Sequence, residues 1–177
     1  MDIGVISVRY ARALLKGSQE AGAEDQVYAE MQTLADSYIS VPELRHTMDS
    51  PMLPAEKKTE LLTAACGGKV SELTSRFIDL IVSSGRESEA QFIANSYITL
   101  YRQQKNIISG KLTTAVPVSE AMSQKMQKMV ESRTNGTVEF KTEVDPEIIG
   151  GFILEYDTYR MDTSVKKQLS NILKQLN

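Results

Sequence analysis

Few side chains in this sequence could carry out catalysis, and their positions do not combine into a reactive set. The chain has one histidine, His46, and one cysteine, Cys66. A Ser-His-Asp or Cys-His arrangement would have to use His46, which lies in a short polar segment between two proline breaks. Cys66 has no second cysteine for a disulfide or a cysteine-based zinc site. We therefore predict no catalytic residue and no metal ligand.

The glycine motifs of the chain are incomplete as phosphate-binding motifs. Gly67-Gly68-Lys69 resembles the end of a phosphate loop, but that loop needs a glycine at position 63 and a serine or threonine at position 70. The chain has Thr63 and Val70 there, so a turn that ends a helix is the better interpretation. Gly150-Gly151 lacks the third glycine of a dinucleotide fingerprint. We predict no cofactor, and an enzyme is only the third interpretation of this chain.

Net charge and hydropathy indicate whether the chain binds nucleic acid or enters a membrane. The net charge is −3, so no basic excess is available to neutralise nucleic-acid phosphates or anionic lipids. No apolar run approaches the roughly 18 residues that a membrane span requires. The start of the chain has no signal or transit pattern, and one lone thiol fits a reducing compartment. We expect a cytosolic protein that reaches a membrane only through a partner.

Helices are predicted over the first 105 residues, and they position His46, Cys66 and the Gly67-Gly68 turn. Apolar residues recur with the helical period, and Gly, Pro and short polar links interrupt them. The predicted helices cover about residues 5–21, 24–40, 43–48, 55–65, 71–84 and 88–106. Six helices joined by short links predict a compact bundle, which we assign to residues 1–105.

The character of the sequence changes after Lys105, and residues 106–177 are predicted to form a small α+β module. Segments rich in β-branched residues or with alternating polarity predict strands over 108–118, 137–145 and 150–162, the last of them a single strand or a hairpin. Residues 119–133 and 164–177 predict amphipathic helices. The expected fold class is mainly α with α+β: a six-helix N-terminal bundle followed by a small mixed sheet with helices.

Three segments together resemble one known family. These are VRYARALL at 8–15, FIDLIVSSGR at 77–86, and the run from Asp145 to Leu173 that contains Ile-Gly-Gly-Phe and Asp-Thr-Ser-Val ahead of a leucine-bearing helix. Their order and separation resemble the delta subunit family of rotary F-type ATP synthases, which includes the mitochondrial oligomycin-sensitivity-conferring protein. The resemblance covers residues 5–176.

The resemblance implies a non-catalytic stator subunit that links the catalytic head to the peripheral stalk, so that proton-driven rotation is coupled to ATP synthesis. In this family a groove between the first and fifth helices, here Val5–Ala21 and Ser71–Ser84, receives the amphipathic N-terminal helix of a head alpha subunit. Helix-in-groove binding needs apolar side chains at helical spacing. The expected groove residues are Ile6, Tyr10, Ala13, Leu14, Phe77, Ile78 and Ile81. For each of them the pattern fits core packing as well as partner contact.

The family's C-terminal part meets the b-type subunits of the peripheral stalk. The expected contact surface is the last helix, through Leu169, Ile172, Leu173 and Leu176, although these residues could instead pack on the module's own sheet. The resemblance further implies one copy per hetero-oligomeric complex, at the cytoplasmic face of the bacterial inner membrane. The alternative hypothesis is a helical adaptor domain that binds an amphipathic helix of an unrelated partner.

Overall fold

The computed structural model describes residues 3–134, 136–156 and 159–176. The chain divides into two compact units, one ending at Gln103 and one beginning at Gln104. The structure is mostly helical with one mixed four-stranded sheet, which agrees with the predicted fold class. Among the described residues, no helix is long and apolar enough to cross a membrane.

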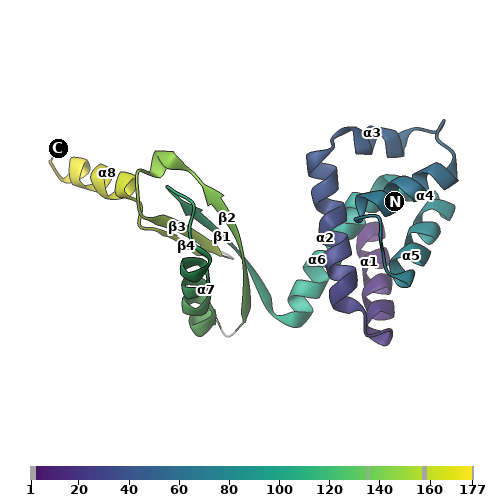
Figure 1. Cartoon of the computed structure of the whole chain (residues 1–177), viewed down its shortest axis with the longest axis horizontal. Coiled ribbons are helices and arrows are strands. Elements are labelled where there is room, and N and C mark those ends of the chain that lie inside the picture. Colours follow the sequence, from purple (N-terminus) through teal and green to yellow (C-terminus); the bar gives the residue numbers. More distant parts are fainter. Residues whose placement is uncertain (1–2, 135, 157–158, 177) are drawn as a thin grey trace. The chain divides into compact units, whose positions relative to one another are not determined.

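The first unit is built from α-helices that pack side by side (Figure 1). Its elements are α1 (Ile3–Glu20), α2 (Glu24–Ser40), α3 (Glu43–Asp49), α4 (Ala55–Ala65), α5 (Glu72–Ser83), the 3-10 helix η1 (Glu87–Glu89) and α6 (Ala90–Lys105). The predicted count of six helices is not exact, because η1 precedes α6. Glu87 of η1 forms a 2.6 Å ion pair with Lys58 of α4, which fixes this extra turn against α4.

The core of this unit lies where α1, α2, α5 and α6 turn their apolar faces inward. Val27, Met31, Ile93 and Tyr97 are each at most 1% exposed. The Tyr97 hydroxyl is 3.0 Å from the Ser18 hydroxyl, so this buried polar atom is satisfied inside the core. The helices bury most of the large apolar side chains that the helical period placed on their inner faces, but Ile39, Leu80 and Phe92 of those stripes are exposed.

A buried carboxylate connects α2 to the start of α5. Glu30 is 6% exposed, and its Oε1 accepts a 2.6 Å hydrogen bond from the Ser71 amide while Oε2 accepts one of 2.9 Å from the Ser71 hydroxyl. The Ser71 hydroxyl in turn accepts from the Thr74 amide at 3.2 Å, so Ser71 is the N-cap of α5. Negative charge at a helix N-terminus is favourable, so Glu30 fixes where α5 begins.

The second unit is a four-stranded sheet with one helix on it. Its elements are β1 (Ile107–Thr114), α7 (Glu120–Thr134), β2 (Thr137–Val144), the 3-10 helix η2 (Pro146–Ile148), β3 (Phe152–Tyr156), β4 (Tyr159–Asp162) and α8 (Val165–Leu176). The strand order is β2-β1-β3-β4, with β1 parallel to β2 and the other pairs antiparallel. The segment 150–162 thus forms a hairpin rather than one strand.

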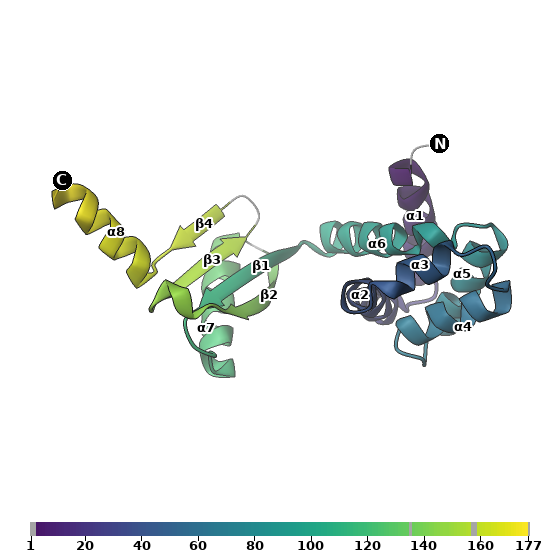
Figure 2. The same cartoon turned by 90° about the horizontal axis from the view of Figure 1, so that it is seen from above.

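Alternation along the strands places one face of the sheet under α7. Leu112 of β1, Val138 of β2 and Leu154 of β3 pack with Val130 of α7, and each of the four is at most 2% exposed. The opposite face carries charged residues that form cross-strand ion pairs, Lys111 with Glu143 and Arg160 with Glu155. Helix α8 does not cover either face: it leads away from one end of the sheet (Figures 1 and 2).

Candidate interaction surfaces

The residues that could have carried chemistry lie apart from one another. His46 is on the exposed side of α3. Cys66 is 3% exposed at the end of α4, and burial raises the pKa of its thiol to about 12, so the thiol is protonated at neutral pH. No group of three or more His, Cys, Asp or Glu side chains that could hold a metal ion occurs within the described part of the chain.

The turn at Gly67-Gly68-Lys69 directs its backbone donors toward its own helix. The Gly67 amide donates to the Ala64 carbonyl and the Gly68 amide to the Thr63 carbonyl, each at 3.0 Å. Both glycines have positive φ, as at a helix C-cap. These amide groups are therefore used in ending α4, which agrees with the turn predicted from the sequence.

The seven residues predicted to line a groove between α1 and α5 do not share one environment. Five are in the core, with at most 6% of their surface exposed: Ile6, Leu14, Phe77, Ile78 and Ile81. Tyr10 is half-buried, and its ring meets that of Phe77 edge to face at 6.4 Å. Ala13 is exposed. Of this set, only Tyr10 and Ala13 are not buried, and the ring contact with Phe77 places Tyr10 beside α5.

Other apolar side chains of α1 and α5 are exposed instead. Val5 is 54% exposed and Leu80 is 49% exposed. In the sequence these residues widen the apolar stripes of their helices beyond what a one-sided core contact needs. That excess width is a sequence signal that part of each stripe is exposed, although it does not identify which residues are.

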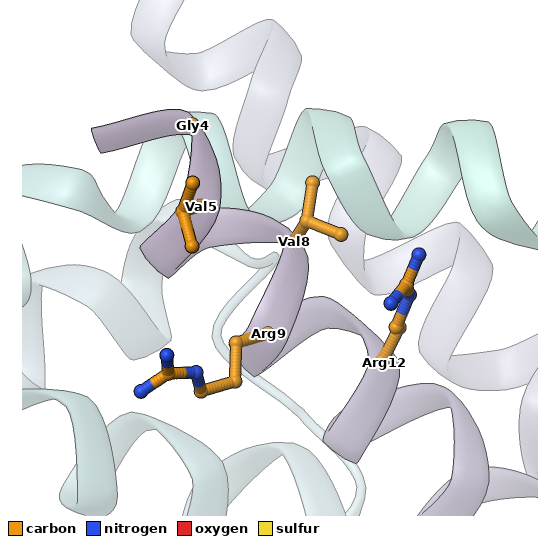
Figure 3. A pocket seen from close by; sticks show the side chains of 5 residues that line it. All are labelled: Gly4, Val5, Val8, Arg9 and Arg12. Atoms are coloured by element: carbon orange, nitrogen blue, oxygen red, sulfur yellow. The ribbon is translucent and has the colours of Figure 1, made fainter. Parts of the chain in front are cut away.

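A surface hollow of about 480 Å³ lies along α1 and is lined by Gly4, Val5, Val8, Arg9 and Arg12. Val5 and Arg9 extend to one side of the helix, and Val8 and Arg12 extend to the other (Figure 3). Both arginines are exposed, as is Lys16 one turn further along. The exposed part of α1 is therefore apolar and basic.

A second hollow of about 520 Å³ lies between α1 and α6, which sequence reasoning missed. It shares Gly4, Val8 and Arg12 with the first hollow. Helix α6 contributes mostly polar side chains together with Phe92, which is 46% exposed, and Leu100. Phe92 is one of the apolar residues of the helix predicted over 88–106. A large apolar side chain at such a position indicates a core residue, so its exposure was not predicted.

The second unit presents its apolar surface on α8. Leu169, Ile172 and Leu173 are 48%, 52% and 63% exposed. The side chain of Leu176, the fourth predicted contact residue, falls outside the described side chains. The exposed residues share one face of the helix, because residues three and four apart are neighbours on its surface. The structure brings these predicted contact residues together, and the sheet of the same unit does not cover them.

Hydrogen bonds at its first turn hold α8 in place. The Asp162 carboxylate accepts from the Ser164 amide at 3.1 Å and from the Ser164 hydroxyl at 2.6 Å, and these bonds lower the pKa of that carboxyl. The Ser164 hydroxyl accepts from the Lys167 amide at 3.2 Å. The Val165 amide donates to the Gly150 carbonyl at 3.0 Å. Asp162, Ser164 and Gly150 are thus fold determinants of the point where α8 leaves the sheet.

Comparison with known proteins identifies a family and relatives that are similar to this chain. The family model described as ATP synthase delta (OSCP) subunit matches residues 6–176. A protein of Phocaeicola vulgatus named ATP synthase subunit delta is 52% identical over 176 residues, which span 99% of this chain and 95% of that protein. A protein of the same name from Parabacteroides distasonis is 44% identical over 172 residues, with 97% and 96% of the two chains covered.

The fold is also similar to a solved structure. One chain in the cryo-EM structure of the Toxoplasma gondii mitochondrial ATP synthase hexamer matches with a TM-score of 0.66. The match covers 96% of each chain at 21% sequence identity, so it concerns the fold alone.

Proposed function

The chain belongs to the ATP synthase delta (OSCP) subunit family, a non-catalytic stator component, and we propose that its two units are the two ends of a mechanical connector. Residues 1–105 bind the catalytic head, and residues 106–177 bind the peripheral stalk. The observation that carries this proposal is the family match over residues 6–176, which spans both units.

The head contact in this proposal is the N-terminal helix of an alpha subunit lying along α1 and α5. The exposed side chains of Val5, Tyr10, Ala13 and Leu80 support it, because an amphipathic helix needs apolar surface to bury. The buried members of the predicted set, such as Ile78, act from beneath by fixing the spacing of the two helices. Exposed Arg9 and Arg12 add a basic rim that favours acidic residues on the partner.

The stalk contact in this proposal is α8 with a b-type subunit. Three of its leucine and isoleucine side chains are about half exposed, which leaves apolar surface that a partner helix can bury. A stator must stay bound under torque, and large well-packed contacts dissociate slowly. Both units would therefore be held to their partners by well-packed non-covalent contacts.

The proposed assembly fixes where the protein works. One copy joins each hetero-oligomeric complex, and the chain meets the membrane only through that complex, at the cytoplasmic face of the bacterial inner membrane. The alternative of an adaptor for an unrelated amphipathic helix predicts the same exposed face on α1 and α5 but a different partner.

Calorimetric titration of the full chain with a peptide of the same organism's alpha-subunit N-terminus tests the head contact. We expect one-to-one binding that Leu80→Asp weakens at least tenfold, which corresponds to about 1.4 kcal/mol. Ile39→Asp is the matched control, since Ile39 is 69% exposed and belongs to α2, which is neither of the two helices of the proposed groove. Equal binding by the wild type and Leu80→Asp would contradict the groove, and no binding by the folded wild type would favour the adaptor.

A further inference from the structure

The C-terminal part of α6 is bound to the N-terminal part of α2 by a cluster of aromatic and charged side chains. The Tyr101 ring stacks on the Tyr28 ring, with 4.1 Å between the ring centroids and 18° between the planes, and both residues are buried. The Tyr101 hydroxyl donates a 2.6 Å hydrogen bond to Asp25 Oδ1. Arg102 Nε donates one of 2.8 Å to the Tyr28 hydroxyl. Two consecutive residues of α6 are therefore attached to α2.

This cluster lies just before α6 leaves the first unit. Residues 103–105, which end the helix, are exposed. The chain then passes through the single residue Asn106 into β1. The last carbonyl groups of a helix have no partner within it, so an exposed helix end frays readily. Force that reaches α6 along the chain from the second unit therefore acts on an exposed helix end before it reaches the cluster.

The interactions in the cluster are of a kind that resists such fraying. Each of the two hydrogen bonds includes one charged group, the Asp25 carboxylate or the Arg102 guanidinium, and hydrogen bonds of this type are stronger than those between neutral groups. The stacked tyrosine rings add buried apolar area. Unwinding α6 back past Tyr101 would expose the rings and break both hydrogen bonds, so the helix end is held by several interactions at once.

We propose that Asp25, Tyr28, Tyr101 and Arg102 form a clamp that keeps the end of α6 wound and attached to α2 while force is transmitted along the chain. They are positioning residues of a stator subunit, because they hold the element through which the chain leaves the first unit. This inference rests on the proposed role of the two units as the ends of a connector. It adds the residues that carry the load inside the first unit.

The hydroxyl groups of the clamp can be removed while the rings stay in place. Tyr28→Phe removes the acceptor of the Arg102 hydrogen bond. Tyr101→Phe removes the donor to Asp25. The matched control is Tyr38→Phe in α2, since the Tyr38 hydroxyl is buried and has no hydrogen-bond partner within the described residues.

Hydrogen exchange of the full chain measures whether the helix end is clamped. In the double variant Tyr28→Phe/Tyr101→Phe, the amides of residues 102–105 should exchange at least about tenfold faster than in the wild type, because two hydrogen bonds with charged groups no longer hold the turn. Tyr38→Phe should exchange like the wild type at these positions.

Proton pumping by the same organism's ATP synthase in liposomes measures whether the clamp carries load. With a protonophore present there is no opposing gradient, and the double variant should hydrolyse ATP like the wild type. Without the protonophore, the ATP-driven proton gradient that the double variant sustains should be smaller by at least about twofold, because force opens the unclamped helix end. Complexes with Tyr38→Phe should match the wild type in both measurements.

The outcomes distinguish this inference from the function on which it rests. Unchanged exchange at residues 102–105 in the double variant would show that there is no clamp. Faster exchange with an undiminished gradient would show that the clamp carries no load, and equal losses in Tyr38→Phe would also overturn the inference. If complexes without this subunit sustain the same gradient as complete ones, the connector role itself is wrong, and the clamp is wrong with it.

Discussion

Ile78 in α5 and Ile172 in α8 belong to amphipathic helices with similar apolar stripes, yet their environments are opposite. Ile78 is 2% exposed and packs in the core of the first unit, whereas Ile172 is 52% exposed at the surface of the second. The stripe shows that a helix has something apolar to cover. It does not say whether the cover is the same chain or another one, because that depends on how the other helices pack.

Placing a charge on each side of the same helix should give the largest contrast. Ile78→Asp buries an unpaired carboxylate in the core of the first unit and should cost about 4 kcal/mol or more in the free energy of unfolding. Leu80→Asp, two residues away and 49% exposed in the wild type, should cost less than about 1 kcal/mol. Denaturant unfolding followed by circular dichroism measures both, and similar losses would show that Leu80 is not a surface residue.

An intermediate effect is expected where α8 leaves the sheet. Gly151 has φ +76°, and a Cβ there would overlap the Thr163 carbonyl oxygen. Gly151→Ala should therefore cost about 3 kcal/mol, because strain at positive φ adds to overlap with the backbone.

Gly85→Ala provides the comparison for that glycine. Gly85 has φ +64° with nothing within 4 Å of the added Cβ, so only the conformational cost of about 1 kcal/mol remains. Thermal unfolding of the two variants separates these contributions, and equal losses would mean that α8 is not held closely at its base.

The smallest effect should come from the apolar face of α8 itself. Ile172→Ser should change the free energy of unfolding by no more than about 0.5 kcal/mol, since the side chain is about half exposed and the unit does not cover it. The matched Ile78→Ser should cost several times as much. Chemical denaturation of the isolated full chain decides the matter, and a large loss for Ile172→Ser would mean that α8 packs on its own unit in solution.

Local signals predicted much of the fold. Ser71 is of a residue type that caps helices, and it marked the start of α5. Residue types at 108–118 and alternation at 137–145 predicted two strands, which bury Leu112 and Val138. The 3-10 turn at Glu87 was missed because its partner, Lys58, is distant in sequence. The positive φ of Ile149, +69°, was also missed, since isoleucine is not a residue type that indicates positive φ.

The interaction surfaces were harder to predict than the elements. Spacing identified α1, α5 and α8, but it could not separate buried Ile81 from exposed Leu80, which are adjacent in sequence. The hollow between α1 and α6 depends on the approach of two helices far apart in the chain, so no local pattern indicates it.

Within the described residues, the hydrogen bonds from α8 to the rest of its unit lie at its first turn, so the helix is held like a cantilever. Its 12 residues extend roughly 18 Å from the hydrogen bonds at Asp162, Ser164 and Gly150. A sideways force at the tip would act on those hydrogen bonds with the full length of the helix as its lever arm. The hydrogen bonds would then break one after another. A partner lying along the whole helix would load the bonds together, in shear, so the geometry of that contact would decide how much torque the joint withstands.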